Sequence, residues 1–367
     1  MNTPLQSVFS QQGQSPWLDN LQRGYLVHGT LRNLIADGVR GLTSNPTIFQ
    51  KAIQGSQDYD EQFATEIERG LTPEQAYWEM VVADINGALD EFSELYELSA
   101  GVDGFVSVEV DPTLAHDGDA TLRAARDLHN KINRANVMIK IPGTPEGLPA
   151  IRTMIAEGRS VNVTLIFSLQ RYAEVMEAYV AGLEDRMNAG HPLRSVHSVA
   201  SFFISRVDNE VDQLLDHIKS PEALALKGKA AIAQAKLAYE LFTQVFSGPR
   251  WQALANAGAH VQRPLWASTS TKNPAYPDTL YVDELIGPHT VNTLPDATLS
   301  AFAHHGNVSR TIDANISEAH RIWERLHSLG VDMTAVSTKL EQEGVSSFIK
   351  SFQELLDALR DKAASLS

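Results

Sequence analysis

Eight short apolar or β-branched segments recur along the chain, and longer amphipathic segments separate them. The short segments are PWLD, VRGLTSN, FVSVEV, VMIKIP, VNVTLIF, SVASFFIS, RPLWAST and HTVNTLP. The intervals have helical periodicity, as in ATLRAARDLHNKI and SLQRYAEVMEAYVAGLE. Strands that alternate with helices pair in parallel, and eight such units favour closure into a ring. The sequence therefore predicts an α/β protein with one (β/α)8 TIM barrel over residues 1–367.

Two segments are longer than a minimal barrel requires. Residues 51–100 lie between the second and third expected strands and predict a helical insertion, with Thr72 as N-cap and Pro73 at the first helical position. Residues 308–367 predict a C-terminal helical extension that packs over the barrel. Because no Gly/Ser linker or internal repeat divides the chain, we expect one domain with added helices.

An open, doubly wound sheet is the main alternative to a closed barrel. Such sheets often bind nucleotides through G-x-G-x-x-G or G-x-x-x-x-G-K-[ST] loops. Neither loop follows the first expected strand or occurs elsewhere in the chain. Nucleotide binding thus lacks its usual sequence support.

Charge and composition exclude several classes of partner. The chain has 30 Lys and Arg against 45 Asp and Glu, a net charge of −15, which disfavours nucleic acids and anionic membranes. A local basic pocket for one small phosphate remains compatible with this charge. The first residues, MNTPLQSVFSQQGQSPW, lack the features of a secretory signal, and no long apolar run follows. We therefore expect a cytoplasmic protein.

Neither a metal nor another cofactor is expected from the sequence. The chain contains no cysteine, which excludes disulfides, thiolate metal sites and a cysteine nucleophile. His304 and His305 are adjacent, and His191 and His197 are six residues apart. These spacings differ from the ligand spacing of helical metal motifs, so solvated or structural histidines are expected.

Lys140 stands inside an apolar strand, in the sequence VMIKIP. Lysine is among the residues least often buried without a partner. One interpretation is an ion pair with a buried carboxylate. The other is catalysis, because an apolar interior penalises a charged amine and a neutral amine can attack a carbonyl to form a Schiff base. The residues alone leave both interpretations open.

Polar residues lie at or near the ends of many expected strands. In a (β/α)8 barrel the carboxyl ends of the strands carry the reactive groups. The polar residues in question are Asp19, Asn45, Glu109, Lys140, Asn162, Thr164 and Ser201. Their distribution is typical of an active site at that end of the barrel.

Several of these segments resemble conserved blocks of the transaldolases. GLTSNPTIFQKAI is similar to the N-terminal signature of that family, and VMIKIPGTPEGLPAI to the segment with its Schiff-base lysine. VSVEVDP, VNVTLIFS and SFFISRVD resemble three further blocks, and all five follow the family order. The resemblance extends from SPWLDNLQR to PLWASTSTKNP. It implies a metal-free (β/α)8 transferase of carbohydrate metabolism, in the pentose phosphate pathway. Such an enzyme transfers a dihydroxyacetone unit between sugar phosphates, for example from sedoheptulose 7-phosphate to glyceraldehyde 3-phosphate.

The resemblance also implies catalytic roles. Lys140 would attack the C2 carbonyl of the ketose and form the Schiff base. Asp19 would act as general acid and base on the C4 hydroxyl, although by sequence it equally fits a helix N-cap. Glu109 and Thr164 would act through a bound water when the carbinolamine forms and loses water. Glu109 is also a plausible charge partner of Lys140.

Four polar residues are implied to bind the dihydroxyacetone unit, and one aromatic residue to line the mouth of the site. The polar residues are Thr43, Asn45, Asn162 and Ser201, and the aromatic residue is Phe203. Without the resemblance, Asn45 is an ordinary turn or helix-start residue. Phe203 is by periodicity an ordinary core aromatic.

Arg206 is implied to bind the substrate phosphate, because a planar guanidinium matches phosphate oxygens in a bidentate contact. The alternative is a surface ion pair with Asp208 or Glu210, which lie close in sequence.

The second phosphate ligand departs from the family pattern. The family places Ser and Arg close together after the seventh strand, whereas this chain has WASTSTKNP. Ser270 with Lys272 is the preferred match, and Ser268 is the alternative to Ser270. Lysine supplies a charge but lacks the bidentate fork of arginine.

Two other functions are compatible with a barrel of this kind. A fructose 6-phosphate aldolase would use the same lysine and release free dihydroxyacetone, but Glu109 and Phe203 favour transfer. A non-catalytic sugar-phosphate-binding barrel has no need of a buried amine, so Lys140 together with Asp19 and Glu109 favours an enzyme. The sequence leaves the oligomeric state open.

Overall fold

The chain forms a closed barrel of eight parallel strands, which follow one another around the ring in chain order. This computed structural model describes residues 2–366, so Met1 and Ser367 of the expected domain lie outside the described range. The predicted (β/α)8 fold is confirmed, with one strand in each expected segment. The strands are β1 (Gln14–Leu18), β2 (Gly41–Thr43), β3 (Phe105–Glu109), β4 (Val137–Pro142), β5 (Val161–Ile166), β6 (Ser198–Phe203), β7 (Arg263–Ala267) and β8 (Thr290–Leu294).

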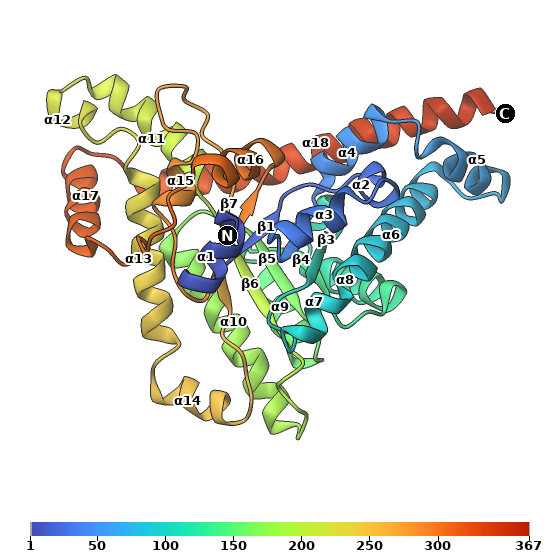
Figure 1. Cartoon of the computed structure of the whole chain (residues 1–367), viewed down its shortest axis with the longest axis horizontal. Helices are drawn as coiled ribbons and strands as arrows, with labels where there is room; N and C mark the ends of the chain where they lie inside the picture. The colour runs from blue at the N-terminus through green and yellow to red at the C-terminus, as the bar shows by residue number, and fades with distance from the viewer. Residues whose placement is uncertain (1, 367) are drawn as a thin grey trace.

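Helices surround the barrel (Figure 1). Those up to β4 are α1 (Pro4–Gln12), α2 (Arg23–Val27), α3 (Thr30–Asp37), α4 (Pro46–Gly55), α5 (Asp60–Glu68), α6 (Pro73–Glu91), α7 (Ser93–Leu98), the 3-10 helix η1 (Pro112–Leu114) and α8 (Gly118–Ile132). Those after β4 are α9 (Gly147–Ala156), α10 (Leu169–Asn188), α11 (Ser205–Ile218), α12 (Pro221–Leu224), α13 (Ala230–Val245), α14 (Pro249–Asn256), α15 (Leu280–Asp283), α16 (Asp296–His305), α17 (Ile316–Ser328) and α18 (Met333–Leu366). Among residues 2–366, no helix has the length and apolar character needed to cross a membrane.

The segment between β2 and β3 is helical. Within residues 51–100 it contains the second half of α4 and the whole of α5, α6 and α7. Thr72 caps α6 as expected: its hydroxyl accepts a hydrogen bond from the Gln75 amide, and the Gln75 side chain accepts one from the Thr72 amide. Pro73 occupies the first turn, where its missing N–H has no consequence.

The last helix, α18, lies across the carboxyl-terminal side of the barrel. In Figure 1 it runs along the top of the molecule, past α11 toward α4 and α5. Buried Phe348 and Phe352 anchor it, and the hydroxyls of Thr47 and Ser351 are 2.8 Å apart. α18 therefore covers the side of the barrel on which the strands end. The division of the chain into a barrel and appended helices stays a prediction.

A buried ion-pair network closes the opposite, amino-terminal end of the barrel. The Asp103 carboxylate accepts hydrogen bonds from Ser15 Oγ at 3.0 Å and Arg40 Nε at 2.6 Å. Two guanidinium nitrogens of Arg263 lie 3.2 Å from its other oxygen. The four residues lie at or just before the starts of β1, β2, β3 and β7. A carboxylate with several cationic and hydroxyl donors is satisfied in the interior, so this network fixes the floor of the barrel.

Candidate active site

The register of three neighbouring strands brings Lys140 together with two polar residues. In the parallel ladder, Glu109 of β3 is level with Lys140 of β4, and Lys140 is level with Asn162 of β5. Residues at the same level on adjacent strands point to the same side, here the barrel interior. The sequence alternation thus places an amine, a carboxylate and an amide in one layer.

Lys140 is a buried lysine held by two oxygen atoms. Its Nζ donates a hydrogen bond of 2.9 Å to the backbone carbonyl of Ser44 and lies 3.2 Å from Glu109 Oε2. The side chains of Lys140 and Glu109 are 6% and 3% exposed. The buried ion pair considered from the sequence is therefore present. It does not exclude catalysis, because the same contact fixes where the amine points.

Asn162 is oriented by hydroxyl groups on both sides. Its Oδ1 accepts a hydrogen bond of 2.7 Å from Ser201 Oγ, and its Nδ2 donates one of 3.0 Å to Ser107 Oγ. Sequence reasoning missed Ser107. Its position two residues before Glu109 on the same strand is the signal that places both on one face.

Asp19 lies one residue beyond the end of β1 and faces the cavity. The helix-cap alternative is wrong, because α2 begins after Gln22 and no side chain caps it. Burial raises the pKa of Asp19 above its usual value; the positive charge of Lys140 opposes this rise and the negative charge of Asp296 adds to it. A carboxyl group with a raised pKa exchanges protons more readily near neutral pH.

Glu109 and Thr164 each present a buried oxygen, Oε2 and Oγ1 respectively, with no hydrogen bond within residues 2–366. The 3.2 Å approach of Lys140 to Glu109 Oε2 is thus an ion pair without hydrogen-bond alignment. Burial raises the pKa of Glu109, and Lys140 partly offsets this. Buried oxygens without a hydrogen bond are groups that a bound water satisfies.

The backbone next to Thr164 is irregular. Leu165 has a φ of 62°, and the pairing of β5 with β6 shifts between Val163 and Ile166. A branched residue with positive φ is uncommon, and such bulges change the direction of neighbouring side chains. Strained backbone of this type often accompanies functional sites.

Thr43, Asn45 and Phe203 all line the same cavity. Asn45 Oδ1 accepts a hydrogen bond of 2.9 Å from the Ile48 amide and caps α4, so the helix-start interpretation is also correct. The amide Nδ2 of Asn45 makes no hydrogen bond within residues 2–366. Phe203 is mostly buried, with its ring 4.9 Å from that of Phe167, and the Arg206 guanidinium lies 5.3 Å from its centre.

Arg206 forms neither of the surface ion pairs considered from the sequence. Asp208 instead accepts hydrogen bonds from the Ala231 amide and Tyr281 hydroxyl, and Glu210 pairs with Lys339 at 2.6 Å. Burial lowers the pKa of the Arg206 guanidinium from its ordinary value. The group lines the cavity as an unpaired cation within the described residues.

The STSTK segment places both candidate serines at the cavity. Lys272 Nζ donates a hydrogen bond of 2.8 Å to Ser270 Oγ, so these two groups lie side by side. The Ser268 hydroxyl lies 3.0 Å from the Ser205 hydroxyl instead. The preferred pair, Ser270 with Lys272, is thus the more suitable one for a shared anion.

The cavity has a volume of about 370 Å³, within the size range of small-molecule sites. Ten of the twelve residues proposed from the sequence line it, and Glu109 and Asn162 contact its walls through Lys140 and Ser201. Sequence reasoning missed Lys51 of α4 and Ser347 and Phe348 of α18, which also line it. These residues reach the site through helix packing, for which the sequence has no local signal.

A family model described as Transaldolase/Fructose-6-phosphate aldolase matches residues 16–359. The chain belongs to this family. A protein of Parafrankia sp. (strain EAN1pec) named Transaldolase is 52% identical over 367 residues, covering 100% of this chain and 99% of that protein. A Thermobifida fusca (strain YX) protein with the same name is 51% identical over 366 residues, 99% of each chain. Transaldolase 1 of Streptomyces avermitilis is 51% identical over 361 residues, 97% of this chain and 96% of that protein.

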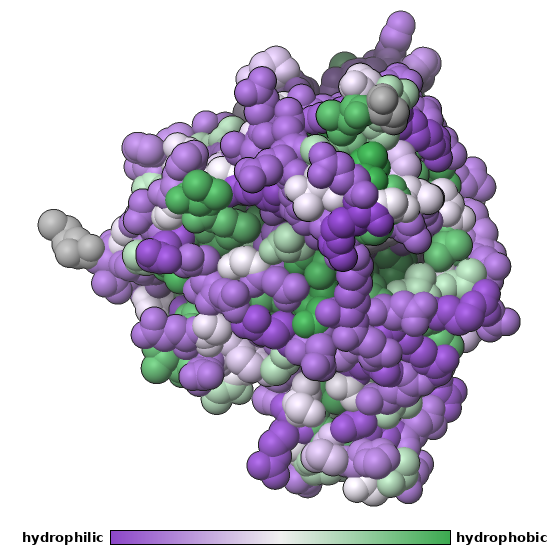
Figure 2. Space-filling model, turned by 90° about the vertical axis from the view of Figure 1, so that its right-hand side faces the viewer, coloured by the Kyte–Doolittle hydropathy of each residue, from purple (hydrophilic) through white to green (hydrophobic). Residues whose placement is uncertain are grey.

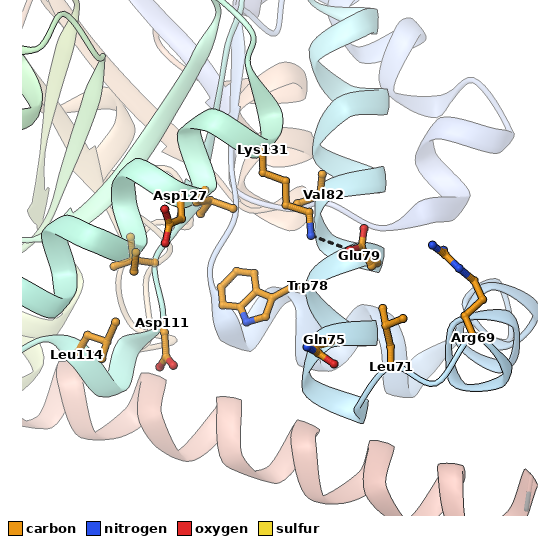
Figure 3. A pocket seen from close by; sticks show the side chains of 13 residues that line it. Arg69, Leu71, Gln75, Trp78, Glu79, Val82, Asp111, Leu114, Asp127 and Lys131 are labelled. Atoms are coloured by element: carbon orange, nitrogen blue, oxygen red, sulfur yellow. Dashed lines mark hydrogen bonds and ion pairs between the residues drawn. The ribbon is translucent and has the colours of Figure 1, made fainter.

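A second hollow, of about 640 Å³, lies outside the barrel between α6, η1 and α8 (Figure 3). Trp78, Leu71 and Leu114 contribute apolar walls, and Lys131 pairs with Glu79 at 2.8 Å on one side. The surface on that side of the molecule is mostly hydrophilic, with apolar residues gathered in places (Figure 2). None of the twelve functional residues predicted from the sequence lines this hollow. The smaller cavity inside the barrel is therefore the candidate active site.

Proposed function

We propose that the chain transfers a dihydroxyacetone unit from a ketose phosphate to an aldose phosphate through a Schiff base on Lys140. The donor and acceptor pair is sedoheptulose 7-phosphate and glyceraldehyde 3-phosphate, or the reverse pair, fructose 6-phosphate and erythrose 4-phosphate. The observation that carries the proposal is a buried lysine between a carboxylate and a carbonyl, at a cavity with unpaired cations. A buried amine of this kind is suited to attack a carbonyl carbon.

The chemistry begins when Lys140 gives a proton to Glu109, its ion-pair partner, and the neutral amine attacks C2 of the ketose. The carbinolamine then loses its hydroxyl as water, with Glu109 and Thr164 holding the water that relays the protons. Each has a buried oxygen without a hydrogen bond within residues 2–366, which supports this role. The product is a protonated imine at C2, which accepts electrons from an adjacent bond.

Asp19 then removes the proton from the C4 hydroxyl. The C3–C4 bond breaks, its electron pair moves toward the imine to form an enamine, and the aldose phosphate leaves. The enamine carbon attacks the aldehyde of the acceptor, and Asp19 returns the proton to the new hydroxyl. Water then adds to the product imine at C2, and cleavage of the C–N bond releases the new ketose phosphate and frees Lys140. The raised pKa of Asp19 supports both directions of this transfer.

The dihydroxyacetone unit would be held by Thr43, Asn45, Asn162 and Ser201, with Phe203 toward the mouth of the site. The hydrogen bonds that fix the Asn162 amide support this assignment, because a preorganised amide orients a hydroxyl without further ordering.

Phosphate binding at the mouth is assigned to Arg206, Ser270 and Lys272. We add Lys51, which lines the cavity from α4 and has no ion pair within the described residues. Arg206, Lys272 and Lys51 line one cavity and form no ion pair with another described residue. In a chain of net charge −15, such a cluster of positive charge favours a dianionic substrate. Lys51 also adds positive charge at a site where Lys272 stands in place of an arginine.

The test separates transfer from simple aldol cleavage. Fructose 6-phosphate is supplied with and without erythrose 4-phosphate, and glyceraldehyde 3-phosphate release is followed with a coupling dehydrogenase. We expect sustained product release only when the acceptor is present, because without it each enzyme molecule releases glyceraldehyde 3-phosphate once and stays loaded as the enamine. Acceptor-independent release of free dihydroxyacetone at a comparable rate would instead assign the aldolase activity. A cytoplasmic location for this reaction stays a prediction.

A further inference from the structure

Four arginines surround an open hollow at the amino-terminal end of the barrel. Arg126 comes from α8, Arg152 from α9, Arg159 from the loop before β5, and Arg186 from the last turn of α10. The hollow has a volume of about 840 Å³. It lies where β5 begins, whereas the candidate active site lies where the strands end. The two sites share no lining residue.

The arginines outnumber the carboxylates in this hollow. Arg152 forms a bidentate pair with Asp185, with N···O distances of 2.6 and 2.9 Å. Arg126 and Arg159 share a single carboxylate, that of Glu157. Four positive and two negative side chains leave a surplus of two positive charges. Such a surplus is notable in a chain with net charge −15.

Within residues 2–366, Arg186 has no carboxylate partner, and the backbone holds it in place. It donates to the carbonyls of Pro192 at 2.7 Å and Ala156 at 3.3 Å. Its guanidinium packs over Gly158, which has a φ of +88°, and a Cβ at this glycine would lie 2.6 Å from Arg186 Nη1. A side chain at Gly158 would displace the guanidinium, so the absence of a side chain there is needed for the position of Arg186.

Each of the four guanidinium groups keeps one nitrogen without a hydrogen-bond partner among residues 2–366. These nitrogens are Nη1 of Arg126, Nη1 of Arg152, Nε of Arg159 and Nη2 of Arg186. Burial, and then the nearby charge of Arg126, lower the pKa of Arg159. An anion in the hollow would relieve this repulsion and use the free donors.

We propose that this arginine hollow binds a small phosphate dianion, either inorganic phosphate or a phosphate monoester, independently of the active site. Planar guanidinium groups match phosphate oxygens, and the surplus of two charges matches a dianion. The ligand would link the ends of α8, α9 and α10. Because it binds the folded chain alone, it would raise the melting temperature by mass action.

The test uses inorganic phosphate and isothermal titration calorimetry, with chloride holding the ionic strength constant. The Lys51→Gln/Arg206→Gln/Lys272→Gln variant removes the three cations proposed to bind phosphate in the active site. We expect it to retain one phosphate site. Adding Arg159→Gln and Arg186→Gln should lower the remaining affinity about tenfold or more, because charge-assisted contacts are lost. Adding Arg360→Gln is the matched control, since this exposed arginine is paired with Asp357 on α18, outside the hollow.

Three results would overturn the proposal. One is loss of all phosphate binding in the Lys51→Gln/Arg206→Gln/Lys272→Gln variant, and another is unchanged affinity after the arginines of the hollow are replaced. The third is saturation by an acidic peptide but not by phosphate, which would indicate a protein partner. If the variant with Arg186→Gln does not fold, Arg152→Gln takes its place and the phosphate affinities are compared in the same way. Arg152 is exposed. None of these results bears on Lys140.

Discussion

Replacement of Asp19 by asparagine separates imine formation from carbon–carbon bond cleavage. The substitution keeps the shape of the side chain and removes its ability to accept the C4 hydroxyl proton. Asp19 lines the cavity and makes no side-chain hydrogen bond within the described residues, so the fold loses little. Loss of a positioned general base costs a factor of about 10² to 10⁴ in rate, or about 3–5 kcal/mol in the barrier.

Two assays on Asp19→Asn distinguish the steps. The coupled transfer assay should show kcat reduced by about two to four orders of magnitude. Borohydride reduction with fructose 6-phosphate should still attach the sugar to the protein, because Lys140, Glu109 and Thr164 are intact. Two results would refute the assigned role of Asp19. One is a kcat of the variant within tenfold of the wild-type value. The other is loss of the borohydride-trapped sugar adduct together with loss of turnover.

The pH dependence of kcat gives a further check on Asp19. The base acts only when ionised, so kcat falls as the pH drops through the pKa of Asp19, which burial raises. The acid limb should therefore lie above the usual range of an aspartate. Asp296→Asn is the matched control: it removes a nearby negative charge that raises this pKa, so it should keep kcat and move the acid limb to lower pH. An acid limb that does not move in this control would contradict the electrostatic account.

Three further substitutions test other parts of the structure. Lys51→Gln should raise the KM for phosphorylated substrates about two- to tenfold and weaken its salt dependence, whereas exposed Lys350→Gln should change neither. Lys272→Ala should impair phosphorylated substrates more than unphosphorylated ones, and equal losses for both would exclude a phosphate contact. Asp103→Asn should lower the free energy of unfolding by about 3–5 kcal/mol in urea, because it leaves buried guanidinium groups unpaired. A loss below about 1 kcal/mol would show that the Asp103 network contributes little.

The barrel could be predicted from the sequence because alternation and parallel pairing are local signals. Strand ends and family motifs were enough to predict that Glu109, Lys140 and Asn162 belong to one site. The strand register explains why they lie in one layer. Only the structure could exclude the helix-cap alternative for Asp19, because that alternative depends on where α2 begins. The same holds for the ion-pair alternatives for Arg206, which depend on the charges that face it.

Features built by distant segments could not be predicted. Lys51 and Phe348 meet at one cavity only because α18 packs against α4. The Ser44 carbonyl that holds Lys140 is a backbone group with no side-chain signal. Asp103 lies just before the start of β3, and its partners come from the starts of three other strands, which converge only when the barrel closes.

Borohydride trapping at Lys140 tests the central claim most directly. The protein is incubated with fructose 6-phosphate, reduced and digested, and the peptides are analysed by mass spectrometry. We predict a reduced dihydroxyacetone or hexose phosphate adduct on Lys140, within VMIKIP, and none in Lys140→Met. An adduct on another lysine, or transfer activity without any adduct, would contradict the Schiff-base account.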